Sequence, residues 1–152
     1  MWKRLQRFNA LDWRAQSLFL RAAVLLPVVA LSLRLRGLRA TQATLEAFLS
    51  TSGERNHQRP ADRSMAKDAS EIARMVQAAS RYGVMRPTCL EKSLALWWFL
   101  GRRGIASSLR IGTRKNGNRL EAHAWIELGG RALNETGGPI PDYAPFDAAL
   151  PM

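Results

Sequence analysis

The stretch that decides the fold reads Pro87-Thr88-Cys89-Leu90-Glu91. Thr88 and Glu91 have the T-x-x-E spacing of a capping box, and the proline before them disfavours helix upstream. A helix is therefore predicted to begin here, with Cys89, the only cysteine of the chain, in its first turn. Unpaired backbone N–H groups and the positive end of the helix dipole stabilise an anion at that position, which favours the thiolate form of a cysteine.

A histidine follows on a predicted strand, which reads EAHAWIE over residues 121–127. Small and apolar residues alternate along this segment, so His123 and Trp125 are expected on the face opposite Ala124 and Ile126. A thiol at a helix start and a histidine on a strand are the minimum that a cysteine nucleophile requires. The alternative is that the cysteine is buried and inert.

Composition limits the class of protein. The chain has 152 residues, 47% of them hydrophobic, which is enough for one domain with a real core. Its net charge of +11 attracts nucleic acid, anionic lipid or acidic protein without choosing among them. A lone cysteine excludes an intrachain disulfide, and we expect a cytoplasmic protein. The sequence has no zinc-ligand spacing and no glycine-rich phosphate loop, so we expect neither a metal nor a cofactor.

The first third of the chain is predicted to be helical and basic. Asp12 is expected to cap a helix that Pro27 kinks or restarts and Gly37 ends, and Thr41 opens a short second helix.

The apolar run over residues 22–33 in this region is shorter than the about 20 residues that a spanning helix needs. We expect it to pack on the core or to face a protein partner, with attachment to a membrane surface less favoured. The side chains that either cover the core or dock a partner are Leu20, Val24, Leu25 and Val28.

A polar linker over residues 51–63 is predicted to separate the basic segment 1–50 from a core over residues 64–152. His57 lies in this linker, where a histidine is most often solvated. The core is predicted to open with a helix that ends near Gly83. Its expected buried stripe is Ile72, Met75, Val76, Ala79 and Tyr82.

The remaining elements complete an α+β fold. The helix over residues 88–103 is apolar around much of its circumference and is expected to be central. Asn116-Gly117 indicates a hairpin, and Gly129-Gly130 a second turn. The stretch after residue 136 is predicted to be irregular and to lie over the core through Tyr143 and Phe146. The helix that bears Cys89 is thus expected to pack on a small antiparallel sheet.

A cysteine helix followed by a histidine-bearing sheet is the order of papain-like and transglutaminase-like enzymes. Segments 86–90 and 121–127, with Gly130 downstream, closely resemble the transglutaminase-like domain of lasso-peptide B proteins, over about residues 65–135. Those proteins are cysteine peptidases that remove the leader peptide from a ribosomally made precursor. The resemblance implies that Cys89 is the nucleophile and His123 the base, and that the cysteine helix and the sheet form a papain/transglutaminase-like core.

The third catalytic residue is less well defined. The family pattern has an aspartate about where Glu135 stands, and this chain has Asn134-Glu135 there. A two-residue turn at 129–130 pairs Trp125 with Asn134, whereas a turn one residue longer sets Glu135 opposite His123. Glutamate and asparagine both accept a hydrogen bond from an imidazole. We assign Glu135 by resemblance and keep Asn134 as the alternative.

The resemblance also implies partners. The N-terminal helical segment looks like that of stand-alone peptidase subunits, so we expect the precursor leader peptide as substrate and a separate leader-recognition protein as partner. The lasso cyclase is a further candidate partner, and no nucleic acid is expected. Two alternatives stay open. The same Cys–His pair serves acyl or amide transfer in similar folds, and a non-catalytic basic module would explain the charge alone.

Overall fold

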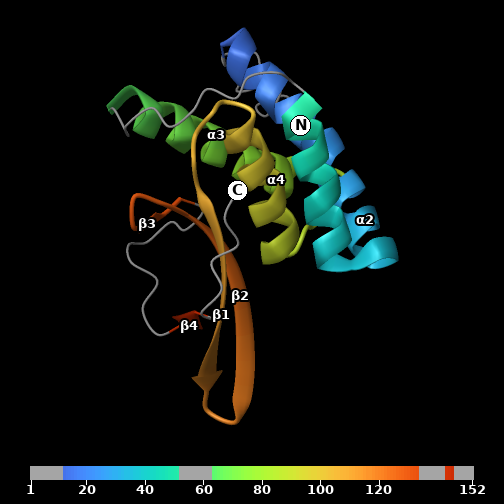
Figure 1. Ribbon diagram of the computed structural model, residues 1–152, viewed down its shortest axis with the longest axis vertical. Coiled ribbons are helices and arrows are strands. Elements are labelled where there is room, and N and C mark those ends of the chain that lie inside the picture. Colours follow the sequence, from blue (N-terminus) through green and yellow to red (C-terminus); the bar gives the residue numbers. More distant parts are fainter. Residues whose placement is uncertain (1–11, 52–62, 134–142, 146–152) are drawn as a thin grey trace.

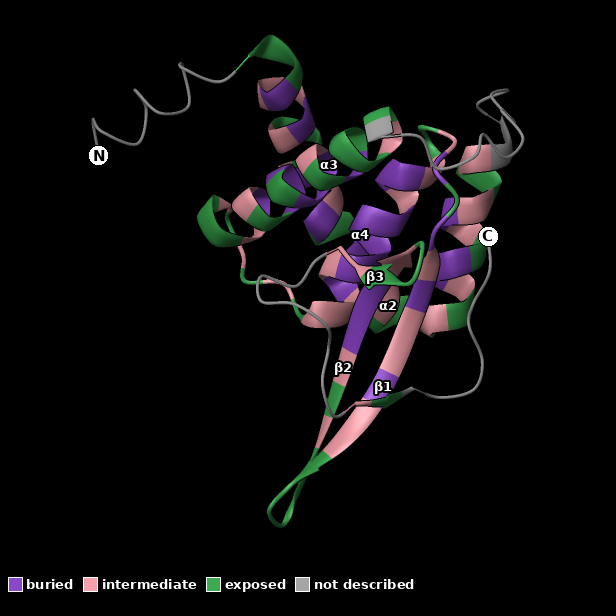
Figure 2. Cartoon of the chain, turned by 90° about the vertical axis from the view of Figure 1, so that its left-hand side faces the viewer, coloured by how far each residue is buried: buried purple, intermediate pink, exposed green. Residues whose placement is uncertain are grey.

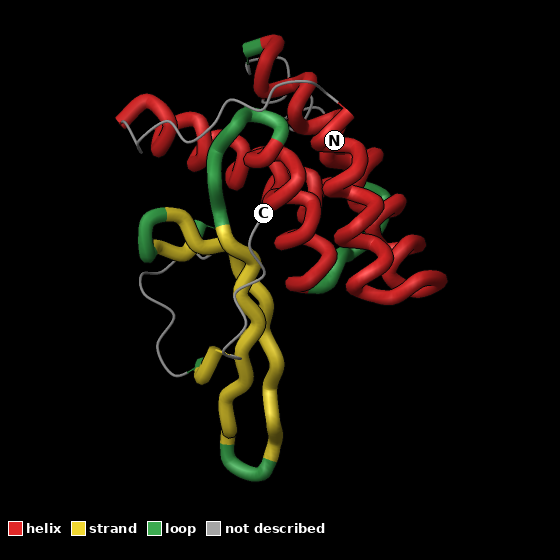
Figure 3. Tube along the Cα trace, in the orientation of Figure 1, coloured by secondary structure: helices red, strands yellow, loops and turns green. Residues whose placement is uncertain are grey.

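The structure, a computed structural model, describes residues 12–51, 63–133 and 143–145. Its helices are α2 (Trp13–Thr51), α3 (Arg63–Tyr82) and α4 (Cys89–Gly101). Its strands are β1 (Ser108–Asn116), β2 (Arg119–Leu128), β3 (Arg131–Ala132) and β4 (Ala144–Pro145). The α+β class is confirmed. The helices group at one end of the molecule, and the β1–β2 hairpin extends away from them (Figures 1 and 3).

The sheet has the order β3-β2-β1-β4, with every neighbouring pair antiparallel. The predicted hairpin is confirmed, although its turn residues are Gly117 and Asn118 because Asn116 pairs with Arg119. Gly117 has φ 59°, the left-handed conformation that such a turn requires. The second predicted turn is also present and has two residues, since Leu128 pairs with Arg131.

The helix α4 lies at the centre of the core, as predicted. Leu94, Trp97 and Leu100 are fully buried, and α4 contacts α2, α3, β1 and β2. Figure 2 shows the buried residues concentrated where the helices meet the inner half of the hairpin, while the hairpin tip is exposed. The inner half of the sheet is therefore the part that α4 holds in place.

The predicted stripe of α3 is mostly correct. Ile72, Met75, Val76 and Ala79 are buried, but Tyr82 is 58% exposed. Tyr82 is the last residue of the helix, so it lies beyond the part of α3 that packs on the core. The chain leaves the helix at Gly83, whose N–H donates to the Ala79 carbonyl at 2.7 Å. A side chain at Gly83 would collide with that carbonyl oxygen.

The helix α2 does not restart at Pro27, and its break lies at Gly37, where the predicted helix was expected to end. The backbone stays helical through this proline, and the interruption falls at Gly37 (φ 76°, ψ 178°). Pro27 is exposed, so the carbonyl that it leaves without a helical partner lies on the side facing water. By length and composition, Trp13–Leu49 is long and apolar enough to cross a membrane. The helix is therefore longer than the apolar run over residues 22–33 indicated.

One hydrophobic cluster joins the helices to the sheet. It includes Leu26 of α2, Ile72 of α3 and Trp97 of α4, with Leu109 and Ile126 from β1 and β2. One face of α2 is thus built into the same core as the cysteine helix. The predicted linker lies almost entirely outside the described residues, and the division into segments 1–50 and 64–152 stays a prediction.

Candidate active site

Cys89 is the first residue of α4, and two reciprocal hydrogen bonds between Thr88 and Glu91 cap the start of this helix. The Glu91 N–H donates to Thr88 Oγ1 at 3.3 Å, and the Thr88 N–H donates to Glu91 Oε2 at 2.7 Å. The predicted capping box is therefore confirmed. Cys89 itself is half-buried, so its thiol lies at the core boundary rather than deep inside it.

A buried hydrogen bond ties this helix to the histidine strand. Ser93 Oγ donates to the Ala124 carbonyl at 2.9 Å, and Ser93 is fully buried. Ser93 lies one helical turn after Cys89, and residues four apart share a helix face. Ala124 directly follows His123. The bond therefore ties α4 to β2 at the residue that directly follows His123.

The direction of this contact follows from the strand geometry. The Leu133 N–H donates to the Ile126 carbonyl at 2.9 Å, so that carbonyl points toward β3. Carbonyls two residues apart on a strand point the same way. The Ala124 carbonyl hence also points to the β3 side, and Ser93 approaches β2 from that edge. This is the edge of β2 that pairs with β3.

His123 lies among aromatic side chains. Its ring stacks on Trp125, with centroids 6.2 Å apart and planes at 16°, and tilts against Tyr143 at 5.3 Å. Trp125 is buried. By strand alternation the imidazole lies on the sheet face opposite Ala124 and Ile126, as predicted. The aromatic contacts limit how far the ring can turn.

A glycine next to His123 makes this packing feasible. Gly112, on β1, pairs with His123 on β2 and with Pro145 on β4. A Cβ at Gly112 would lie 2.8 Å from the Ala144 carbonyl oxygen and 3.0 Å from Trp125 Cη2. The absent side chain therefore lets both β4 and the indole ring approach the strand beside the histidine.

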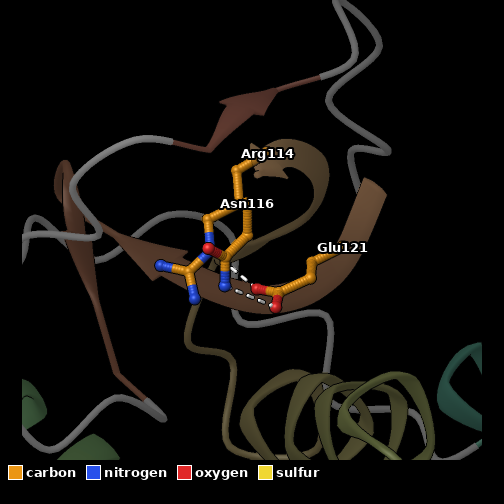
Figure 4. A network of polar contacts seen from close by, with 3 residues as sticks. All are labelled: Arg114, Asn116 and Glu121. Atoms are coloured by element: carbon orange, nitrogen blue, oxygen red, sulfur yellow. Dashed lines mark hydrogen bonds and ion pairs between the residues drawn. The ribbon is translucent and has the colours of Figure 1, made fainter. Parts of the chain in front are cut away.

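A polar network further along the hairpin supports Tyr143. Arg114 Nε and Asn116 Nδ2 donate to the Glu121 carboxylate at 2.8 and 3.0 Å (Figure 4). The hydrogen bonds from Asn116 and Arg114 hold the pKa of Glu121 below its usual value. The Arg114 guanidinium also lies 4.8 Å from the centre of the Tyr143 ring. Arg114 thus connects the hairpin to an aromatic neighbour of His123.

Several predicted residues lie outside the described part of the chain. They are Asn134, Glu135, His57 and Phe146. The turn before β3 nevertheless has two residues, and a turn of that length pairs Trp125 with Asn134. In the part of the chain that the structure describes, no three His, Cys, Asp or Glu side chains group as metal ligands would.

Sequence reasoning missed two residues of this site. Ser93 follows Cys89 by four positions, and that spacing was its only local signal. Tyr143 was expected to cover the core, and it does pack on the buried Trp125, but its contact with His123 was not foreseen. No local pattern indicates this contact, because it joins the residue just before β4 to a strand about 20 residues earlier, a contact that only the folded chain creates.

Comparison with known proteins gives the family. Residues 28–147 match the family model of the transglutaminase-like superfamily. Searches of curated proteins and of solved structures found no matching protein. The matched range covers most of the chain and includes both Cys89 and His123. The chain therefore belongs to the transglutaminase-like superfamily, which includes cysteine-dependent peptidases and transferases.

Proposed function

We propose that this chain is a cysteine peptidase that removes the leader peptide from a ribosomally made lasso-peptide precursor. The observation that carries the proposal is the join between α4 and β2. Cys89 begins a capped helix, and one turn later Ser93 bonds to the strand directly after His123. The superfamily supports cysteine chemistry, and the resemblance of segments 86–90 and 121–127 supports the leader peptide as substrate.

The proposed reaction uses the chain's own residues at each step. His123 takes the proton of the Cys89 thiol, and the thiolate attacks the carbonyl carbon of the scissile amide. First-turn N–H groups of α4 stabilise the resulting oxyanion. The C–N bond then breaks, His123 protonates the leaving amine, and a thioester remains. Water, deprotonated by His123, attacks the thioester and releases a carboxylate and the free thiol.

The orientation of His123 is the second part of the proposal. Trp125 and Tyr143 restrain the ring by packing, and a polar side chain after β3 accepts its other N–H. Family resemblance supports Glu135 for this role, and the two-residue turn supports Asn134. Both residues follow β3 in the sequence.

Leader recognition is proposed to lie on a separate protein, with the lasso cyclase as a further partner. The net charge of +11 favours acidic segments in the leader or in the recognition protein. A transferase is the second candidate function, because the same thioester passes its acyl group to an amine when an amine replaces water. The superfamily includes enzymes of both kinds.

The decisive experiment is product analysis. The chain is incubated with a candidate precursor and its recognition protein, and the products are identified by mass spectrometry. We expect a leader with a free carboxylate and a core peptide with a free amine. A new amide on the leader would establish transfer instead. An unchanged precursor, or equal cleavage by Cys89→Ala, would overturn the proposal of cysteine catalysis.

A further inference from the structure

The helix α2 has a second apolar face that stays exposed. Its large side chains are each between 56% and 74% exposed and recur at spacings of three and four, with a tryptophan two turns before the first of them. At about 3.6 residues per turn these positions form one line along the helix. This line, called here the α2 stripe, consists of Trp13, Leu20, Val24, Val28, Leu31 and Leu35.

The core does not enclose this stripe. The opposite face of the same helix carries Ala15, Leu18, Ala22, Leu26 and Val29, all at most 8% exposed and all within the core cluster. The helix α2 thus has one apolar face that packs in the core and a second apolar face that is exposed to solvent. Only 28% of the most apolar 18-residue stretch of α2 is buried. A helix enclosed by a protein core would be buried to a far greater extent.

The charges beside the stripe are all positive. Residues 13–45 contain no Asp or Glu. Arg21 lies three residues before Val24 and Arg34 three after Leu31, so the two arginines border the stripe on opposite sides. Both are exposed.

Two more arginines lie close to the stripe, at the C-terminal end of α4. Arg102 and Arg103, at the end of α4, line a groove of about 800 Å³ together with Arg21, Val24 and Val28. The Arg102 guanidinium lies 5.3 Å from the centre of the Trp98 ring. The groove thus borders the α2 stripe at Val24 and Val28, and its arginines add positive charge beside the stripe.

We propose that the α2 stripe attaches this protein to the surface of a bilayer that contains anionic lipid. The helix lies in the plane of the interface, with the stripe in the acyl region and the flanking arginines at lipid phosphates. Sequence alone favoured core packing or a protein partner over a membrane surface for this helix. A line of exposed side chains that is apolar from Leu20 to Leu35, with arginines on both sides and no acidic residue, reverses that preference, because protein interfaces combine apolar contacts with hydrogen-bonding groups.

Other occupants fit the structure less well. A membrane-spanning α2 would have to separate Leu26 and Val29 from the core, which would expose the apolar faces of α3 and α4. A second copy would bring together two chains of charge +11, which repel each other. Surface attachment keeps the packed face in place and uses the positive charge.

The test is sedimentation of the full chain with lipid vesicles, without substrate. Its outcome is therefore independent of the proposed peptidase activity. We expect binding to vesicles of phosphatidylcholine mixed with phosphatidylglycerol at low salt, and release by high salt. Phosphatidylcholine alone should bind weakly. Each of Arg21→Gln and Arg34→Gln should lower the partition coefficient roughly fivefold, the effect of one charge near an anionic surface.

Stripe variants give the sharper comparison. The double variant Val24→Glu, Leu31→Glu should lose vesicle binding and keep its circular dichroism spectrum, because both positions are exposed. Val84→Glu is the matched control, since Val84 is fully exposed but lies outside the stripe. Equal binding to neutral vesicles, or equal loss in the control, would overturn the proposal.

Two further results would show that the α2 stripe does not lie on a lipid surface. Retention on vesicles after alkaline carbonate washing would favour a spanning helix. Absence of vesicle binding, combined with a stripe-dependent dimer or complex with the recognition protein, would favour a protein surface.

Discussion

The helices α4 and α2 are both strongly apolar but differ in their surroundings. In α4 the core encloses most side chains, and Leu94 and Trp97 are fully buried. In α2 the core encloses one face, so Leu26 is 2% exposed while Val24 is 68% exposed. The need for a core therefore explains the apolar residues of α4 but only half of those in α2. For α4 the functional question concerns its N-terminal end, and for α2 it concerns its exposed side.

The largest expected effect concerns Cys89 at the start of α4. Replacing it with alanine or serine removes the thiolate that forms the thioester, so precursor cleavage should become undetectable. The melting temperature should change little, because Cys89 is only half-buried. Rates are measured by separating leader from precursor over time. Cleavage at the wild-type rate in either variant would leave α4 with a purely structural role.

The next effect concerns His123 on the strand that α4 holds. His123→Ala should lower the cleavage rate about 10²–10⁴-fold, the usual contribution of a general acid–base group. His57→Ala is the matched control and should change the rate little. Single-turnover kinetics with both variants checks this. A large loss of activity in His57→Ala beside a small one in His123→Ala would show that the catalytic base does not lie on β2.

The third effect distinguishes the two residues that follow β3. Family resemblance predicts the larger loss of activity for Glu135→Ala, whereas the two-residue turn predicts it for Asn134→Ala. Removing the group that orients the histidine should reduce kcat and alter its pH dependence, because the imidazole loses its hydrogen-bonding partner. The pH–rate profiles of the two variants decide between them. A severe loss from Asn134→Ala beside a mild one from Glu135→Ala would remove Glu135 from the site.

The start of α4 was predictable because its signals are local. Thr88 and Glu91 lie three residues apart, and their side chains bond within the same turn. Sequence also indicated both turns of the sheet, since glycines there take the left-handed conformation. The histidine strand followed from the alternation of its side chains.

The rest of the site depends on contacts between distant segments. Ser93 bonds to Ala124, and Tyr143 packs on His123. Neither pair has a sequence signal, because the partners meet only after the helix and sheet have packed. At Pro27 the local rule was overridden, since the packing of Leu26 and Val29 holds the helix on both sides of the proline. For the same reason, sequence could not tell which face of α2 the core uses.

The two faces of α2 can be compared directly by substitution. Leu26→Ala should lower the free energy of unfolding by about 2–5 kcal/mol, because it leaves a cavity in the core. Val24→Ala, two residues away on the exposed side, should change it by no more than about 0.5 kcal/mol. Urea unfolding of the two variants measures both values. Equal destabilisation would mean that the stripe also contributes to the core.

The smallest expected effect concerns the cap beside Cys89. Thr88→Ala removes the oxygen that accepts the Glu91 N–H and should lower the free energy of unfolding by about 1 kcal/mol. Thr88→Ser retains that oxygen and should lie close to the wild type. Because the cap sets the first turn of α4, Thr88→Ala should also slow cleavage, and Thr88→Ser should restore it. If Thr88→Ala lowered stability but left cleavage unchanged, the cap would support the helix without positioning the nucleophile.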